Sequence, residues 1–109
     1  ISLSESRFQM NKIERALTYI HEEYGSKMDI EQLSQLVNMS ATTFYRSFKQ
    51  VTACSPVQYL KKVRLTQAKK LLVEESLQVK VVADRVGYES TSQFSREFKR
   101  YFGQSPGAV

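Results

Sequence analysis

Apolar residues recur every three or four positions along most of this chain, the spacing of one face of an α-helix. No segment shows the strict alternation of a half-buried strand, so the pattern predicts an all-α fold. The predicted helices cover about residues 11–24, 30–37, 41–52, 56–75, 79–86 and 91–102. The short polar segment 1–10 lacks helical periodicity and is interpreted as a linker remnant.

Two segments of the chain repeat each other at an offset of 50 residues. Ser, Phe, Arg, Phe and Lys recur in step in residues 40–49 and 90–99, and the echo continues to Ser-Pro at residues 55–56 and 105–106. Each copy follows a short apolar helix and a turn, which is the pattern of a helix-turn-helix. We therefore predict two such units, at residues 11–54 and 76–109, joined by a connecting helix at 55–75.

The turns and helix ends support this division. The short helices before the turns match at an offset of 49, so the second turn has one extra residue. Asn38 and Gly87 stand at corresponding places, and both residue types tolerate left-handed backbone. Gly25 and Gly103 are predicted C-terminal caps. Capping boxes are predicted at Asp29 with Gln32, Ser55 with Gln58, and Ser90 with Gln93, and Ser40 is a further predicted N-cap.

The apolar stripes define the expected core. On the second helix of each predicted unit, residues 41–52 and 91–102, which we call the recognition helices, the i and i+4 spacing of the phenylalanines favours a core role over base stacking. The side chains predicted to face inward include Ile13, Ala16, Leu17, Ile20, Tyr24, Ile30, Leu33, Leu36, Val37, Phe44, Phe48, Val51, Val57, Leu60, Val63, Ala68, Leu71, Leu72, Val79, Val82, Ala83, Val86, Phe94, Phe98, Tyr101 and Phe102.

The net charge of +5 is unevenly distributed along the chain. Residues 1–39 hold six acids and four bases, whereas residues 40–73 hold seven bases and no acid. A solvated basic face is one interpretation of such a run, and a surface facing phosphates is the other. Because the run lies between two helix-turn-helix units, double-stranded DNA is the leading candidate partner.

Other chemistry has little support in the sequence. One cysteine, Cys54, and one histidine, His21, cannot build a disulfide or a common four-ligand zinc site. We expect a tolerated thiol and an exposed surface histidine, with no catalytic site, metal or cofactor. No run approaches the roughly 20 apolar residues of a membrane span. The expectation is a cytoplasmic protein without membrane contact, and the start at Ile1 suggests excision from a longer chain.

Each recognition helix carries a polar stripe away from its phenylalanines. Hydroxyls and long basic side chains suit a major groove, where Arg can bind guanine O6 and N7 and Ser or Thr can contact bases or phosphates. Ordinary polar surface is the alternative for any single position, and Tyr45 lies at the edge of the buried side. The predicted DNA-binding residues are Thr42, Tyr45, Arg46, Lys49, Thr91, Ser92, Gln93, Ser95, Arg96 and Lys99.

The connecting helix sets the expected spacing of the two units. Twenty helical residues measure roughly 30 Å, and successive major-groove segments on one side of B-DNA are about 34 Å apart. We therefore predict that one monomer reads two adjacent major-groove segments.

These residues resemble the DNA-binding domain of the AraC/XylS family of bacterial transcription regulators over about residues 11–106. Its second-unit signature is matched by Val82-Ala83, Gly87-Tyr88, Ser90, Phe94-Ser95-Arg96, Phe98-Lys99, Gly103 and Ser105-Pro106, and a second motif by Arg64-Leu65, Ala68 and Leu71-Leu72. The resemblance implies a homeodomain-like domain of about seven helices. It also implies binding to promoter DNA, activation or repression of transcription, contact with RNA polymerase, and an N-terminal sensor or effector domain.

The sequence differs from the family pattern at two positions, and two alternative functions remain open. Val109 stands where the family commonly has an aromatic residue, so the seventh helix is expected to be truncated, and Ser34 replaces a small alanine. The rivals are the DNA-binding module of a DNA repair alkyltransferase fusion and a protein-interaction module on a helix-turn-helix scaffold. The first needs a reactive cysteine, and Cys54 lacks metal-binding or activating companions. The second would lack salt-dependent DNA binding.

Overall fold

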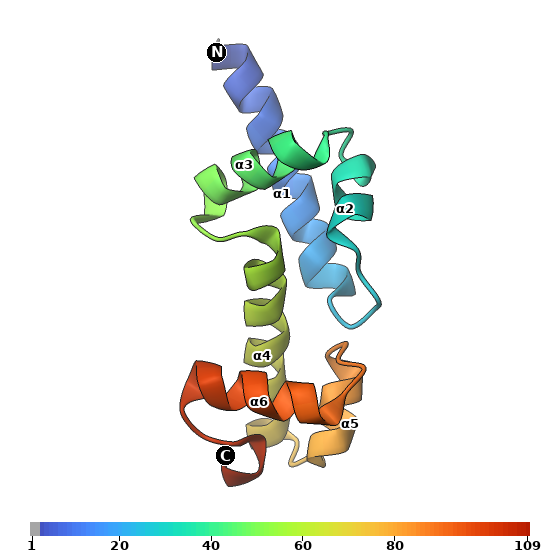
Figure 1. The fold of residues 1–109 in the computed structure, drawn as a ribbon, viewed down its shortest axis with the longest axis vertical. Coiled ribbons are helices and arrows are strands. Elements are labelled where there is room, and N and C mark those ends of the chain that lie inside the picture. Colours follow the sequence, from blue (N-terminus) through green and yellow to red (C-terminus); the bar gives the residue numbers. More distant parts are fainter. Residues whose placement is uncertain (1–2) are drawn as a thin grey trace. The chain divides into compact units, whose positions relative to one another are not determined.

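The computed structural model describes residues 3–109, with side chains from Arg7 onward. Within these residues the regular structure is entirely helical, in agreement with the predicted all-α class. The elements are α1 (Leu3–Glu23), α2 (Ile30–Leu36), α3 (Ala41–Thr52), α4 (Pro56–Glu74), α5 (Val79–Arg85), α6 (Thr91–Phe102) and the 3-10 turn η1 (Pro106–Ala108) (Figure 1).

Helix α1 starts earlier than predicted, at Leu3 instead of residue 11, so the expected absence of helix before residue 11 is wrong from Leu3 onward. The segment lacks an apolar stripe, but it also lacks proline and glycine. Adding residues to an existing helix is far easier than nucleating one. The Lys12 ammonium lies 4.6 Å from the centre of the Phe8 ring, one turn away, and so covers part of this exposed aromatic side chain.

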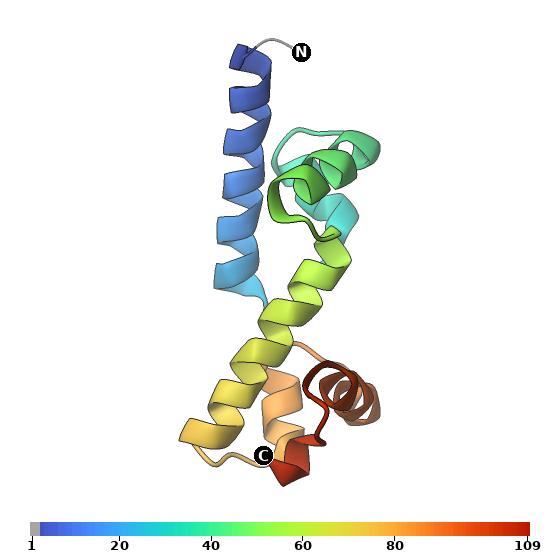
Figure 2. The ribbon, with the colours of Figure 1, turned by 90° about the vertical axis from the view of Figure 1, so that its left-hand side faces the viewer.

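The first compact unit contains α1, α2, α3 and the first turn of α4. Helix α1 contacts α2 and α3, which lie on the same side of it (Figure 2). The Phe48 ring contacts Phe44 and Tyr59, with centroids 5.6 and 5.5 Å apart. The buried apolar side chains of this unit are Ile13, Ala16, Ile20, Leu33, Val37, Met39, Phe44, Phe48 and Leu60.

The second compact unit contains residues 24–27 and 61–109. Helix α6 crosses the C-terminal part of α4 and follows α5 through a short turn (Figure 1). Its core contains Leu65, Ala68, Leu72, Val82, Ala83, Val86, Tyr88, Phe94 and Phe98. Each phenylalanine pair therefore serves its unit's core, as predicted, with Phe44, Phe48, Phe94 and Phe98 all fully buried.

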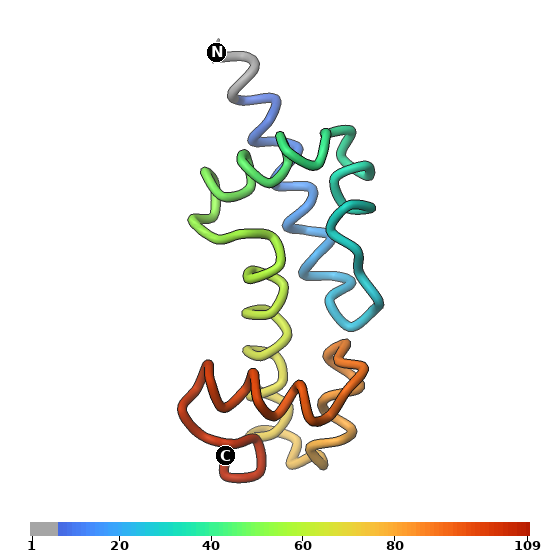
Figure 3. The backbone as a smooth tube through the Cα atoms, in the orientation of Figure 1, coloured from blue at the N-terminus to red at the C-terminus, as the bar shows by residue number. Residues whose placement is uncertain are grey.

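The two helix-turn-helix turns have the predicted backbone. Asn38 has φ 57° and Gly87 has φ 100°, both in the left-handed region. The recognition helices end alike, with Ala53 at φ 62° after α3 and Gly103 at φ 79° after α6. Figure 3 traces the chain through these turns.

The predicted serine N-caps are also present. Ser40, Ser55 and Ser90 each accept a hydrogen bond from the backbone N–H three residues later, at 3.2 Å. Asp29 caps α2 through the N–H of Glu31 at 2.9 Å. These bonds satisfy donors that a helix N-terminus leaves unpaired, so they fix where each helix begins.

Gly25 has a different role from the predicted left-handed C-cap, because its φ is not positive. A Cβ at Gly25 would lie 2.6 Å from the carbonyl oxygen of Arg85, within the second unit. The prediction was wrong because close backbone approach, which involves residues 60 positions apart, leaves no local signal. Any side chain at this position would force the two segments apart.

Four residues predicted to face inward are substantially exposed: Leu36 49%, Val51 41%, Val57 46% and Tyr101 47%. Helical periodicity predicts which way a side chain points around the helix axis. It does not predict how far along that helix a neighbouring helix extends and covers the apolar face. Val51 and Tyr101 occupy equivalent places in the last turns of α3 and α6. Leu36 corresponds to Arg85 in the second copy, where the exposed position is polar.

The two departures from the family pattern have small structural effects. Ser34 is 2% exposed, and its hydroxyl donates to the carbonyl oxygen of Glu31 at 2.6 Å, so its burial leaves no unsatisfied donor. The predicted truncated seventh helix is the single 3-10 turn η1, which contacts α6 and buries Pro106.

Candidate nucleic-acid interface

The stripe predicted on α3 lies on the outer surface of the first unit. Thr42, Tyr45, Arg46 and Lys49 are all exposed, while the phenylalanines of α3 are fully buried. Tyr45 is 48% exposed, which places this edge residue with the polar stripe. The stripe therefore offers a hydroxyl, a phenol and two basic side chains to one partner.

The stripe on α6 has the same arrangement in the second unit. Thr91, Ser92, Gln93, Arg96 and Lys99 are exposed, and Ser95 is half-buried. The fully buried Phe94 and Phe98 hold the opposite face against the core, with ring centroids 5.6 Å apart. The rigid core thus orients a row of donors outward, as a recognition helix requires.

Gln93 does not complete the predicted capping box. Its backbone N–H binds the Ser90 hydroxyl, but its side-chain Nε2 donates to Glu97 Oε2 at 2.9 Å, one turn further along α6. The other carboxylate oxygen of Glu97 accepts from the Tyr88 hydroxyl at 2.7 Å. The amide thus donates to a charged carboxylate instead of accepting from the neutral backbone N–H of Ser90, because hydrogen bonds to ionised groups are the stronger ones.

Glu97 is a residue that the sequence reasoning missed. Its side chain is only 16% exposed, and Lys61 Nζ lies 3.8 Å from Oε2. Burial alone would raise its pKa, but the hydrogen bonds from Tyr88 and Gln93, together with the charges of Lys61 and Arg100, lower the pKa overall. The carboxylate is therefore ionised at neutral pH. The Gln-x-x-x-Glu spacing was a usable signal, whereas the contribution of Tyr88 was not visible locally.

Tyr88 is correspondingly held in its neutral form. Burial, the hydrogen bond to Glu97 and the charge of Glu97 raise the pKa of Tyr88 well above its usual value, and the Arg64 charge opposes this only in part. Its ring lies 5.2 Å from the Phe94 centroid, so the phenol ties the polar network to the core of the second unit.

Arg64 differs from the rest of the basic run that was predicted to face phosphates. Its Nε donates to the carbonyl oxygen of Tyr24 at 2.9 Å and its Nη2 to that of Ser26 at 3.0 Å. Burial lowers the pKa of Arg64, partly offset by Tyr88 and Glu97. Arg64 therefore has a structural role, because its guanidinium group holds the backbone of the segment after α1. The other six bases of the run are exposed: Arg46, Lys49, Lys61, Lys62, Lys69 and Lys70.

The described residues of the first unit form no equivalent of the network around Glu97. Ser47 stands at the position equivalent to Glu97 and is 4% exposed, and Thr43 stands in place of Gln93. Met39 corresponds to Tyr88 at the offset of the preceding helices. The two recognition helices therefore share their outer stripe but differ in what supports it.

The lone histidine and cysteine belong to the first unit and are part of neither stripe. His21 is exposed, as predicted, and its Nε2 lies 2.8 Å from the Tyr59 hydroxyl. Cys54 is a free, half-buried thiol. Among the described residues, no group of three or more His, Cys, Asp or Glu side chains could hold a metal ion. In the same part of the chain, no helix has the length and apolar character needed to cross a bilayer.

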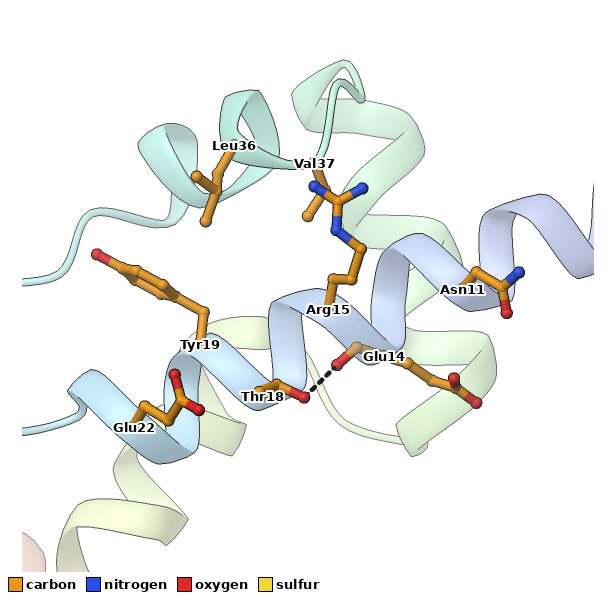
Figure 4. A pocket seen from close by; sticks show the side chains of 8 residues that line it. All are labelled: Asn11, Glu14, Arg15, Thr18, Tyr19, Glu22, Leu36 and Val37. Atoms are coloured by element: carbon orange, nitrogen blue, oxygen red, sulfur yellow. Dashed lines mark hydrogen bonds between the residues drawn. The ribbon is translucent and has the colours of Figure 1, made fainter.

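A surface hollow of the first unit lies between α1 and α2 (Figure 4). The side chains of Tyr19 and Leu36 extend into it from the two helices, and Thr18 Oγ1 donates to the carbonyl oxygen of Glu14 at 3.1 Å. None of the predicted DNA-binding residues lines this hollow. It is separate from the candidate interface.

The chain is similar to a known protein family and to several bacterial transcription regulators. A family described as a helix-turn-helix domain matches residues 33–109. The Msm operon regulatory protein of Streptococcus mutans is 30% identical over 105 residues, which cover 96% of this chain and 37% of that protein. The raffinose operon transcriptional regulatory protein RafR of Pediococcus pentosaceus is 37% identical over 91 residues, with coverages of 84% and 33%. The chain thus spans about a third of these relatives.

Two solved structures have the same fold. The C-terminal domain of AraT, a response regulator from Geobacillus stearothermophilus, is 31% identical with a TM-score of 0.86, covering 89% of this chain and 81% of that one. The DNA-binding domain of AdpA, a global transcriptional factor solved with a target DNA, is 32% identical with a TM-score of 0.86 and coverages of 88% and 86%. The chain belongs to the AraC-type family of helix-turn-helix DNA-binding domains.

Proposed function

We propose that this domain binds double-stranded promoter DNA sequence-specifically and regulates transcription in bacteria. The observation that carries the proposal is the pair of matched, exposed stripes on α3 and α6, each on the second helix of a helix-turn-helix. Basic side chains supply phosphate contacts, and hydroxyl, amide and guanidinium groups supply base contacts. The complex of AdpA with a target DNA supports the same partner.

The proposed mode is one monomer reading two adjacent major-groove segments. Helix α4 is continuous from Pro56 to Glu74, without a break between the two units that it joins. A helix of this length resists bending, so it would impose a spacing on the two recognition helices. That spacing supplies specificity through the distance between half-sites as well as through base contacts.

The wider roles are also proposals. Relatives about three times longer than this chain support an N-terminal sensor or effector domain in the full-length protein. A relative from Escherichia coli, RclR, is named a transcriptional activator, which supports activation of transcription as a role. Contact with RNA polymerase is a further part of the proposal. We propose a cytoplasmic location and no enzymatic step, since the family consists of transcription regulators.

Salt dependence of DNA binding tests the core of this proposal. Each phosphate that a protein neutralises contributes about 0.9 to the slope of log affinity against log salt concentration. Replacing Lys49 or Lys99 by alanine should reduce this slope by about 0.9 on duplex DNA. Lys27→Ala is the matched control, because it removes the same charge from a side chain that is 93% exposed and lies on neither stripe.

The outcomes separate the candidate functions. A steep slope in the wild type, reduced by the stripe variants but not by Lys27→Ala, supports DNA binding by α3 and α6. Equal slopes in all three variants would contradict this assignment of the interface. Binding that does not depend on salt would favour the protein-interaction module. Methyl transfer from alkylated DNA to Cys54 would favour the repair-enzyme fusion.

A further inference from the structure

Among the predicted DNA-binding residues of α6, Gln93 differs in that its side chain is hydrogen-bonded within the protein. Its backbone N–H binds Ser90 Oγ at 3.2 Å, and its side-chain amide binds Glu97 at 2.9 Å. Gln93 nevertheless remains exposed, in the first turn of the helix. The first turn is the part of a recognition helix whose side chains contact base edges.

The chemistry of this contact fixes the orientation of the amide. An ionised carboxylate can only accept hydrogen bonds, so the NH₂ group of Gln93 must face Glu97 and its carbonyl oxygen must face away. One N–H hydrogen is used by Glu97 and the second is left over. No hydrogen bond of the described residues uses the carbonyl oxygen Oε1. One acceptor and one donor are therefore available in a known arrangement.

Glu97 is suited to hold this arrangement without contacting DNA itself. Its side chain is only 16% exposed, and the Tyr88 hydroxyl at 2.7 Å and the Lys61 ammonium at 3.8 Å restrict it further. Its lowered pKa keeps the carboxylate charged at neutral pH. A glutamine side chain normally loses much rotational freedom when it binds. Here the free protein has already ordered it, so less of that loss accompanies binding.

We propose that Gln93 reads an adenine in the major groove and that Glu97 is the positioning residue that orients it. An adenine presents an acceptor, N7, and a donor, the N6 amino group, which match the free N–H and the carbonyl oxygen of Gln93. The proposal rests on the proposed function and names the base class that this part of the interface recognises. The network also distinguishes the two units.

The first unit has different residues at the two positions equivalent to Gln93 and Glu97. At the position equivalent to Gln93 it has Thr43, which is half-buried, and at the position equivalent to Glu97 it has Ser47, which is buried. A threonine there cannot form the bidentate adenine contact. A strong adenine preference of this origin is therefore expected in the half-site of the second unit alone.

Selection from a random duplex library, followed by affinity measurements on the selected site and its single-base variants, tests the proposal. The wild type should prefer adenine at one position of the second half-site by about 5- to 150-fold over guanine. Gln93→Ala should abolish that preference and leave the other positions unchanged. Glu97→Ala should weaken the same single preference several-fold.

Glu97→Gln is the rescue variant. Its amide oxygen can still accept from Gln93, and its NH₂ group can donate to the Tyr88 oxygen, so most of the adenine preference should return. A merely structural role for Glu97 would instead lower the active fraction and leave the base preferences intact. Thermal melting of each variant, followed by far-UV circular dichroism, shows whether the fold is retained.

Three results would overturn the inference: an unchanged adenine preference in Gln93→Ala, an unchanged preference in Glu97→Ala, or the same loss in Glu97→Gln as in Glu97→Ala. In each case the wild type would still select a defined site, so the proposed function would stand. A wild type that selects no site at all would contradict the proposed function itself. The two failures are therefore distinguishable.

Discussion

Phe98→Ala should destabilise the second unit by about 3 to 5 kcal/mol. Phe98 is fully buried, and its ring centroid lies 5.6 Å from that of Phe94 and 4.6 Å from that of Phe102. A buried aromatic side chain removes about 150 to 250 Å² from water, worth about 4 to 6 kcal/mol at about 25 cal/mol per Å². The compactness of real denatured chains reduces this by roughly 10–40%.

The loss is large relative to the whole stability of a small domain, about 5 to 15 kcal/mol. Urea unfolding followed by far-UV circular dichroism measures it, and native-state hydrogen exchange locates it. Amides of α5 and α6 should lose protection, because their core contains Phe98. The exchange of α2 and α3, which belong to the other compact unit, should change less.

Two matched variants sharpen the test. Phe48→Ala empties the equivalent, fully buried position of the first unit and should cost a similar amount there. Tyr101→Ala removes an aromatic side chain that is 47% exposed, and it should cost clearly less. The reasoning would be refuted by a Phe98→Ala protein that unfolds like the wild type but no longer binds DNA, because Phe98 would then belong to the interface.

Three further predictions concern binding and pH. Arg46→Ala and Arg96→Ala should each cost about 1 to 3 kcal/mol of specific binding and relax preference at one base position; unchanged affinity in both would remove them from the interface. One monomer should protect roughly 15 to 20 base pairs from nuclease cleavage. Five base pairs inserted between the half-sites should reduce binding towards the affinity of one unit. Full affinity on the site with the insertion would mean that α4 is flexible or that only one unit reads DNA. Finally, the neutral Tyr88 phenol contributes stability that is fully present below pH about 10, where unfolded tyrosine titrates. As the pH rises above that value towards the raised pKa of the folded state, the denaturant midpoint of the wild type should fall, and that of Tyr88→Phe should fall less steeply. Parallel curves of midpoint against pH for the two proteins would contradict the assignment.

Most of the fold could be predicted from local patterns. Apolar periodicity identified every long helix, and the serine caps placed the starts of α3, α4 and α6 correctly. The internal repeat also indicates that Leu36 faces solvent, because it aligns with the charged Arg85 of the second unit. The helical segment before residue 11 was missed because the prediction relied on an apolar stripe, which a helix that extends beyond its core does not need.

The helices, the two-fold repetition and the polar stripes could be recognised in the amino-acid sequence, because they depend on interactions within one or two helical turns. Tertiary structure alone decided which polar groups meet across the fold. Arg64 binds carbonyl groups about 40 residues away, Gly25 makes room for the Arg85 carbonyl, and Tyr88, in the turn before α6, donates to Glu97 nine residues later. Such pairings follow from how the helices pack, and no spacing along the chain encodes them.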